Sequence, residues 1–286
     1  MGEQQNCPSC DEVIIGQFCH QCGEKQFSQH DLSISKVAKH AIAAVTDIDG
    51  KWLKTIKLLL TQPGVLSTHY LSGIRKHLLT PFQLLLFCSI KFFLIAGLVG
   101  YSAFTTPLKT HLNAENFIHQ KVAQELVSDR LKQTGQDAGE FAEAFNDTAE
   151  FQARTLVMLM VPMFAVVVFL LYPSQSHPVV SSLVFATHVF AFMLLLQALM
   201  THVLLQSLLY LSSFIAVLQS SGYAVELIYS LLMFTCFGVY FYLASRRVYQ
   251  NNVTLSLIKA LVFTFSVYWV FIIYRMILFY TTFYSL

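Results

Sequence analysis

Acidic residues are almost absent from the second half of this 286-residue sequence. Of the 16 Asp and Glu residues, 15 precede residue 155, and Glu226 is the only one in the last 132 positions. Charged residues make up 12% of the chain, against about 25% in soluble domains. Hydrophobic residues make up 55%, and the mean hydropathy is +0.57. This composition excludes a single soluble globular domain and predicts a protein embedded in lipid.

Common catalytic motifs are also missing. The sequence has no G-x-x-x-x-G-K-[ST], G-x-S-x-G or H-E-x-x-H motif, and no pair of aspartates falls in an apolar segment. These absences argue against ATP-driven work and intramembrane hydrolysis, while an unfamiliar lipid chemistry stays open. We therefore favour a protein that is not an enzyme. The start of the sequence lacks the basic residues and apolar run of a signal peptide, so we expect no cleaved signal.

Five apolar segments are long enough to cross a hydrocarbon core about 30 Å thick, which takes roughly 20 helical residues. They occupy residues 82–103, 155–172, 179–204, 223–244 and 255–282. The sequence thus predicts an all-α polytopic membrane protein with about five transmembrane helices, in a transmembrane domain covering residues 81–286. Residues 205–219 would extend the third span along the interface, and two short spans within 179–219 are the competing interpretation.

The distribution of basic residues predicts the orientation of these spans. Eight Lys or Arg residues precede residue 81, and Arg246 and Arg247 lie in a loop that five spans place on the same side. The loop 104–154, on the opposite side, has five basic and eight acidic residues. The positive-inside rule then places the N-terminus in the cytoplasm and the C-terminus outside. We expect the outer loop to be helical, with Asn113 capping one helix and an interruption near Gly135.

Four of the six cysteines lie within the first 22 residues. Each pair forms a CxxC turn, which can offer two thiolates to one tetrahedral ion. A cytoplasmic terminus disfavours disulfides, and a redox CxxC belongs to a thioredoxin-like domain that this sequence does not indicate. We predict a zinc ribbon over residues 1–27, with structural Zn²⁺ bound by Cys7, Cys10, Cys19 and Cys22.

The charge of this predicted ribbon indicates what it binds. Residues 1–30 contain one lysine and four acidic residues, so their net charge is −3. A surface that binds phosphate backbones should be basic. We therefore expect no nucleic acid partner, and a docking role toward a cytoplasmic protein, or a purely structural role, fits better.

Residues 28–80 are basic where the ribbon is acidic. Between 31 and 80, seven basic residues accompany three acidic ones. The periodicity predicts a helix near 51–61 with Trp52 and Leu59 on its apolar side, and a short helix over Val65–Leu71. Such amphipathic juxtamembrane helices can lie on an anionic leaflet and contact membrane lipids. The membrane-surface basic face would comprise Lys51, Lys54, Lys57, Arg75 and Lys76; alternatively, these residues only set the topology.

Several polar residues fall inside or beside the spans, where they are expensive. Lys91 lies about 14 Å into the first span, so it should pair, attract an anion or reach back to the headgroups. His188, His202 and Gln206 share one helical stripe, which is typical of interhelical hydrogen bonds or of a polar path. We predict that the side chains of His202 and Glu226 approach within about 10 Å of each other, near hydrogen-bond reach. The candidate intramembrane polar site is Lys91, His188, His202, Gln206 and Glu226.

One stretch before the first span resembles a known family signature. Its residues are Thr55, Leu58, Leu59, Pro63-Gly64, Tyr70, Gly73, Arg75 and Pro81-Phe82, and Arg246-Arg247-Val248-Tyr249 adds to the likeness. They resemble an uncharacterised bacterial family of zinc-ribbon polytopic membrane proteins, known only as a domain of unknown function. The resemblance covers most of the chain, and Gln250-Asn251-Asn252 departs from the small residue expected there. It implies a protein of the bacterial cytoplasmic (inner) membrane and supplies no activity.

Two functions are compatible with these features. The first is a binding, regulatory or assembly protein whose cytoplasmic zinc ribbon docks a protein partner. The alternative is a transporter or lipid-handling protein for an anionic or amphipathic substrate, using intramembrane Lys, His and Glu side chains. A polar cavity reaching the membrane midplane would favour the alternative. We prefer the first hypothesis because intramembrane charge is so sparse.

Overall fold

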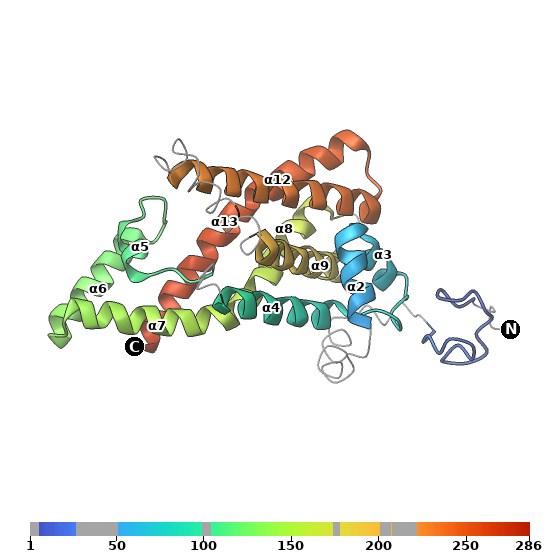
Figure 1. Ribbon diagram of the computed structural model, residues 1–286, viewed down its shortest axis with the longest axis horizontal. Coiled ribbons are helices and arrows are strands. Elements are labelled where there is room, and N and C mark those ends of the chain that lie inside the picture. The colour runs from blue at the N-terminus through green and yellow to red at the C-terminus, as the bar shows by residue number, and fades with distance from the viewer. Residues whose placement is uncertain (1–5, 27–50, 99–103, 174–177, 201–206, 208–221) are drawn as a thin grey trace. The chain divides into compact units, whose positions relative to one another are not determined.

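The computed structural model describes residues 6–26, 51–98, 104–173, 178–200, 207 and 222–286 (Figure 1). Among these residues the regular elements are helices, and two isolated β-bridges occur in the N-terminal cysteine segment. Five helices are long and apolar enough to cross a membrane: Pro81–Leu98, Ala138–Leu171, Pro178–Leu199, Leu227–Tyr249 and Val253–Ser285. The chain is therefore a multi-pass, all-α integral membrane protein, as the composition predicts.

The ends of these helices follow from local capping residues. The first span, α4 (Pro81–Leu98), starts with a capping box, in which the Gln83 side chain accepts from the Thr80 backbone and Thr80 Oγ1 accepts from the Gln83 N–H. The second span starts well before its apolar part. It begins with α7 (Ala138–Leu156), passes a short 3₁₀ turn and ends with α8 (Met160–Leu171).

The chain divides into two compact units, residues 1–92 with 165–264 and residues 93–164 with 265–286. In the first unit, α2 (Lys51–Thr61) and α3 (Val65–Leu71) lie beside α9 (Pro178–Leu199), as Figure 1 shows. Helix α9 is the most buried of the five spans, with 83% of its apolar window inside the structure. It also packs against α12 (Gly222–Tyr249), so it forms the centre of this unit.

Aromatic rings hold the core of the first unit together. Phe241 of α12 stacks on Phe263 of α13 (Val253–Ser285), with ring centroids 3.8 Å apart. Phe192 of α9 stacks on Tyr240 of α12 at 3.5 Å. Phe185 of α9 meets the edge of Phe241 at 5.5 Å. Stacked and edge-on ring pairs stabilise beyond their buried area, so these contacts help to hold α9, α12 and α13 against one another.

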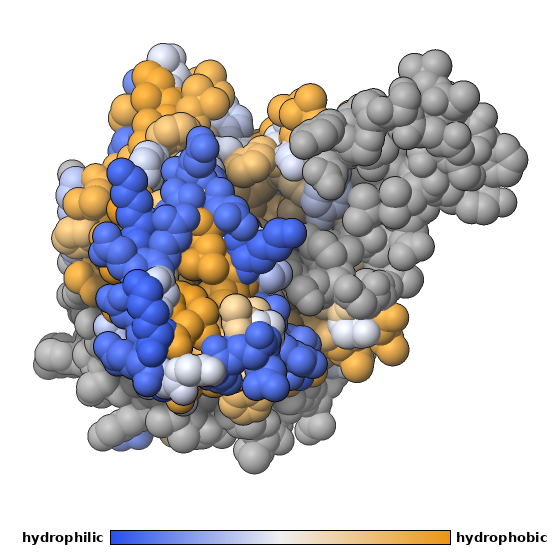
Figure 2. Space-filling model, turned by 90° about the vertical axis from the view of Figure 1, so that its left-hand side faces the viewer, coloured by the Kyte–Doolittle hydropathy of each residue, from blue (hydrophilic) through white to orange (hydrophobic). Residues whose placement is uncertain are grey.

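The second unit contains a helical hairpin. Helix α5 (Leu108–Asn113) precedes α6 (Gln120–Thr134), and α7 returns alongside them. These helices share one apolar cluster with the end of α13. Its buried members are Leu108, Ala123, Val127, Phe141, Phe145, Ala149, Phe279 and Phe283. Figure 2 shows the outer face of this region, where hydrophilic side chains surround a smaller apolar area.

The hairpin corrects one expectation about the loop 104–154. Asn113 ends α5 and caps no following helix, and the next helix begins only at Gln120. The interruption near Gly135 is present, because Gly135 ends α6 with a left-handed φ of 66°. Asp137 then caps α7 by accepting hydrogen bonds from the backbone N–H groups of Gly139 and Glu140. Residues 28–50 of the predicted juxtamembrane segment and the predicted extension 205–219, apart from Ser207, lie outside the described residues.

Candidate metal centre

The N-terminal segment 6–26, which we call the cysteine knuckle, consists of two similar turns. In the first, the Cys7 N–H donates to the Glu12 carbonyl and the Asp11 N–H donates to the Cys7 carbonyl, each at 2.8 Å. In the second, the Cys19 N–H donates to the Glu24 carbonyl and the Gly23 N–H donates to the Cys19 carbonyl, also at 2.8 Å. Asp11 and Gly23 both take a left-handed φ. The two CxxC pairs are therefore folded alike.

This repeated fold brings the four cysteine sulfurs together. All four sulfurs lie within 4.8 Å of one another. The sulfurs of Cys7 and Cys22 are 3.5 Å apart, as are those of Cys10 and Cys19. Ligands held about 2.3 Å from one tetrahedral ion lie about 3.8 Å apart. The sulfurs are too far apart for disulfides and fit a shared metal ion, so the four cysteines could bind one.

The thiols do not have equal acidities in this cluster. The pKa of Cys19 is lowered to about 6, first because the backbone N–H of Cys22 hydrogen-bonds its sulfur. At Cys10 the Glu12 N–H lowers the pKa, but desolvation and the three neighbouring sulfurs outweigh it and raise the pKa to about 12. Four thiolates at these distances repel one another. All four can ionise together only around a cation, which is what a bound metal supplies.

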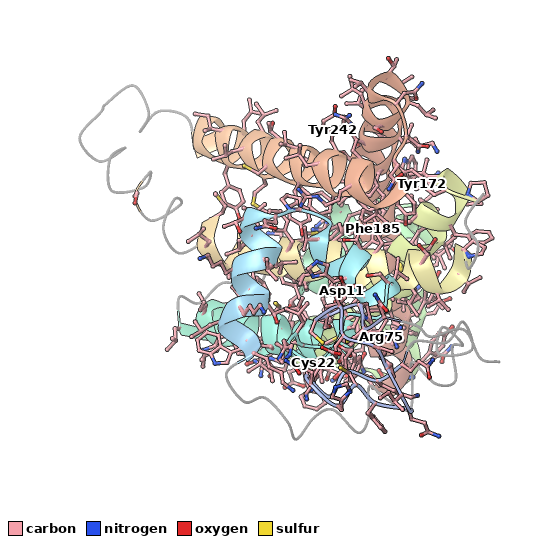
Figure 3. All side chains as sticks on the ribbon, turned by 90° about the vertical axis from the view of Figure 1, so that its right-hand side faces the viewer. Asp11, Cys22, Arg75, Tyr172, Phe185 and Tyr242 are labelled. Atoms are coloured by element: carbon pink, nitrogen blue, oxygen red, sulfur yellow. The ribbon has the colours of Figure 1, made fainter. Side chains whose placement is uncertain are left out.

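A buried carboxylate connects the cysteine knuckle to the segment before the first span. Glu24 is only 3% exposed, and its Oε2 accepts from Ser9 Oγ at 2.7 Å. The same oxygen accepts from the backbone N–H groups of Arg75 and Lys76, at 3.2 and 3.1 Å. Lys76 Nζ also contacts the carbonyl of Cys22. Figure 3 labels Cys22 and Arg75 in this part of the first unit.

The predicted basic face is divided between two environments. Lys54 and Lys57 of α2 are exposed, and Lys51 is half-buried. Arg75 instead lies over the Tyr70 ring, 4.3 Å from its centroid, and donates through Nε to the Tyr70 carbonyl. The Lys76 side chain contacts the cysteine knuckle. Arg75 and Lys76 therefore do not form one continuous basic surface with the lysines of α2.

Two predicted intramembrane residues can be located. Lys91 is exposed on α4, and its ammonium lies 5.7 Å from the centroid of Phe87, one turn toward the start of the helix. This direction is the one expected of a lysine that reaches back to the headgroups. His188 is buried, and its Nδ1 shares a 2.8 Å hydrogen bond with Ser67 Oγ of α3. It therefore makes an interhelical hydrogen bond.

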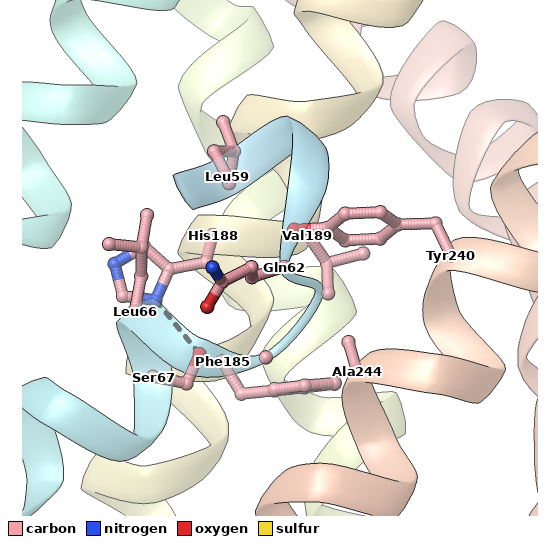
Figure 4. A pocket seen from close by; sticks show the side chains of 10 residues that line it. Leu59, Gln62, Leu66, Ser67, Phe185, His188, Val189, Tyr240 and Ala244 are labelled. Carbon is pink, nitrogen blue, oxygen red and sulfur yellow. Dashed lines mark hydrogen bonds between the residues drawn. The ribbon is translucent and has the colours of Figure 1, made fainter. Parts of the chain in front are cut away.

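A small pocket surrounds this Ser67–His188 pair (Figure 4). Helices α2, α3, α9 and α12 contribute to its lining, which is Leu59, Gln62, Gly64, Leu66, Ser67, Phe185, His188, Val189, Tyr240 and Ala244. The walls leave no room for a water-sized molecule. Within the described residues, the pair thus joins packed helices and does not line a substrate cavity. The side chains of His202, Gln206 and Glu226, with the predicted His202–Glu226 contact, lie outside the described residues.

A second histidine pair, which sequence reasoning missed, lies in the helical hairpin. His111 Nδ1 and His119 Nε2 are 2.9 Å apart, and both residues are almost fully buried. Phe279 packs against both rings. Burial lowers the pKa of His111 to about 3, with a further contribution from His119 and Arg275, and burial also lowers the pKa of His119. Two histidines eight residues apart in a polar loop give no sequence signal of such burial.

Comparison with known proteins places one segment of the chain in context. A family model described as a protein of unknown function (DUF3667) matches residues 49–93, which include α2, α3 and most of α4. Neither the curated proteins nor the solved structures gave a match to this chain. The family match supports the resemblance to an uncharacterised family, and it carries no activity of its own. Ser67, Arg75, Lys76 and Lys91 all fall within the matched segment.

Proposed function

We propose that this membrane protein holds Zn²⁺ in its cysteine knuckle and uses the knuckle to dock a protein partner on the cytoplasmic side of a bacterial membrane. Four thiolates in a tetrahedral cluster are a ligand set that suits zinc. Cysteines at all four positions leave none open for a substrate, so the ion would be structural. A buried cluster of Cys7, Ile14 and Cys19 is too small to fold a segment of this size alone.

The observation that carries the docking role is a pair of exposed apolar side chains on the cysteine knuckle. Ile15 is 88% exposed and Phe18 is 59% exposed. The exposed acidic residues Asp11 and Glu12 lie just before them in the chain. An acidic surface is repelled by an anionic leaflet, so these side chains fit a protein better than lipid. The partner we expect has an apolar pocket bordered by basic residues.

The proposed orientation is supported by contacts at one rim of the first unit. Arg247 Nη1 donates to the Pro63 carbonyl at 3.0 Å, which brings the end of α12 to the α2–α3 turn. Tyr172, just after α8, stacks on Tyr249 at 3.9 Å, and Lys259 lies over the Tyr172 ring at 4.1 Å. If five helices span the membrane, the α2–α3 turn, the end of α8, the end of α12 and the start of α13 all lie on the side of the N-terminus. Their basic residues favour the cytoplasmic face of a bacterial inner membrane.

The transporter or lipid-handling alternative gains no support from the described residues. His188 is hydrogen-bonded to Ser67 in a tightly packed region, and Lys91 is exposed on the surface of α4. A role for His202, Gln206 and Glu226 stays a prediction.

Photo-crosslinking in cells tests the docking role. A photoreactive residue at Ile15 or Phe18 of the full-length protein should give one discrete protein adduct. The adduct should disappear when Cys7 and Cys10 are replaced by Ser. It should also disappear when the substitution Phe18→Glu is added to the protein that carries the photoreactive residue at position 15. The same photoreactive residue at exposed Asn252, in the loop before α13, is the control and should not give that adduct. Adducts with phospholipid at Ile15, or adducts that persist without the cysteines, would overturn the proposal.

A further inference from the structure

The segment 72–80 joins α3 to the first span, and two of its backbone N–H groups point at one oxygen atom. The N–H groups of Arg75 and Lys76 both donate to Glu24 Oε2. Successive backbone N–H groups that converge in this way form an anion-binding nest. The side chains of the same two residues are cationic. Glu24 therefore fills a position that has the chemistry of an anion site.

The position of this nest along the chain suits the phosphate layer of a membrane. Lys76 lies only five residues before Pro81, where the first span begins. Basic residues just outside a span attract anionic lipids. A phosphate group offers the same oxygen acceptors as a carboxylate and carries more of them. The geometry that receives Glu24 can therefore receive a phosphate-type anion.

The presence of Glu24 in the nest depends on the fold of the cysteine knuckle. The backbone carbonyl of Glu24 accepts from the Cys19 N–H in the second CxxC turn. Its carboxylate also accepts from Ser9, which lies inside the first CxxC pair. Both turns must be formed for the carboxylate to be held in this place. A knuckle with so small a core folds only with its metal, so metal loss should release Glu24.

We propose that the backbone N–H groups of Arg75 and Lys76, with the Lys76 ammonium that contacts the nearby Cys22 carbonyl, form a site for a phosphate-type anion that Glu24 closes while the cysteine knuckle holds metal. The metal-dependent part of this inference rests on the proposed zinc site; the anion site itself does not. The anion is either the headgroup of an anionic phospholipid or free inorganic phosphate. In the metal-bound protein the carboxylate is an internal substitute for it, and metal release exchanges one anion for the other.

The test uses the full-length protein in dodecyl maltoside micelles, whose headgroup carries no phosphate, and the variant Glu24→Ala, which keeps all four cysteines. Three conditions are compared: micelles alone, micelles with inorganic phosphate, and micelles with phosphatidylglycerol. Hydrogen exchange of a peptide covering residues 75 and 76 reports on the two amides, and native mass spectrometry counts bound phosphatidylglycerol. The matched control is Glu12→Ala, since the Glu12 side chain is exposed and belongs to the same knuckle.

In micelles alone, Glu24→Ala should raise exchange at the two amides about tenfold or more, because each loses a charged acceptor. Phosphatidylglycerol should restore protection and appear as bound lipid if the anion is a headgroup; phosphate should restore it if the anion is free. Adding Lys76→Gln to Glu24→Ala should remove this gain. Glu12→Ala should behave like wild type. The anion site is overturned if neither anion restores protection, or if Glu24→Ala leaves the amides protected in micelles alone.

Metal content separates this inference from the proposed function. Wild-type protein treated with a chelator should match Glu24→Ala in exchange and in bound anion, whereas untreated wild type should not. If purified wild type contains no metal, the zinc proposal fails, and the Glu24→Ala series still decides the anion site. If the protein contains zinc but chelation leaves exchange at residues 75 and 76 unchanged, the metal dependence is wrong.

Discussion

Several buried polar residues of this protein each hydrogen-bond to another polar group. Glu24 has three hydrogen-bond donors on one oxygen, and His188 has Ser67. His111 and His119 have each other. Burying a polar group without a partner costs several kcal/mol in an apolar environment, on the order of 2–7. These pairs are therefore constraints on how the chain packs, and disturbing one member should have measurable effects.

The histidine pair of the hairpin predicts acid sensitivity. The pKa of His111 is lowered to about 3, because burial and then His119 and Arg275 disfavour its charged form, while a free histidine titrates near 6.5. Above about pH 6.5 both states are neutral and the pair adds no pH dependence. As the pH falls from about 6.5 toward 3, the unfolded chain takes up protons that the folded hairpin refuses, so the free energy of unfolding falls. The loss from His111 should reach about 2 kcal/mol near pH 5.

Thermal unfolding of the purified protein at several pH values measures this loss. Unfolding of the hairpin is detected by protease cleavage within the exposed turn at residues 135–137. The double variant His111→Phe with His119→Phe should unfold with much less dependence on pH. His77→Gln removes an exposed histidine outside the hairpin and serves as the control. An unchanged pH dependence in the double variant would show that other groups cause the acid sensitivity.

At the scale of helices, the turn between α2 and α3 is fixed by close backbone contact. Gly64 has a φ of 83°, which side chains rarely adopt. A Cβ at Gly64 would lie 2.6 Å from the carbonyl oxygen of Ala244 in α12. A backbone atom of a packed helix cannot move away as a flexible side chain can. The glycine therefore lets the start of α3 approach α12. One turn later in α3, Ser67 reaches His188 of α9.

Gly64→Ala should accordingly destabilise the first unit by roughly 1–3 kcal/mol, through left-handed strain and the clash with α12. Gly97→Ala in α4 is the matched control, because nothing lies within 4 Å of its Cβ position. Its expected effect is small or slightly stabilising, since alanine favours a helix. Denaturation midpoints of the two variants in one detergent compare them directly. Equal midpoints would mean that α3 does not depend on close contact with α12.

Local signals in the sequence were sufficient for the elements and insufficient for their contacts. Apolar periodicity and Pro63-Gly64 predict α2 over 51–61 and α3 over Val65–Leu71, and the structure has both at these bounds. The spacing of the CxxC pairs also predicts that their sulfurs gather, which they do. By contrast, Ser67 and His188 are 121 residues apart, and only tertiary packing brings them together.

The same limit applies to the cysteine knuckle and to the hairpin. Glu24 appears in the sequence as one more acidic residue of a negatively charged segment, and its role depends on backbone groups 51 and 52 residues away. Asn113 has the residue type of a helix cap, but α5 ends at this residue, and the buried side chains of Phe117 and His119 lie in the loop before α6. Propensity is a weak guide wherever buried contacts decide the chain path.

At the scale of the whole molecule, contacts within each unit agree with the threading of five spans. In the second unit, Phe279 and Phe283 near the C-terminus pack with Phe145 of the hairpin, so the last span ends beside the loop 104–154. Five spans require this, because they put that loop and the C-terminus on one side. In the first unit, Arg247 contacts Pro63, and five spans put those two residues on the other side.

Labelling of introduced cysteines with a membrane-impermeant maleimide in intact cells should therefore distinguish two positions. Gln133→Cys, at the exposed end of α6, should react without permeabilisation, because residues 104–154 face outward. Asn252→Cys, in the exposed turn between α12 and α13, should react only after permeabilisation, because that turn shares the basic side of the protein. The wild-type protein, with its six native cysteines, gives the background. Equal reactivity of the two cysteines in intact cells would contradict the five-span threading, and the reverse order would invert the orientation and move the cysteine knuckle out of the cytoplasm.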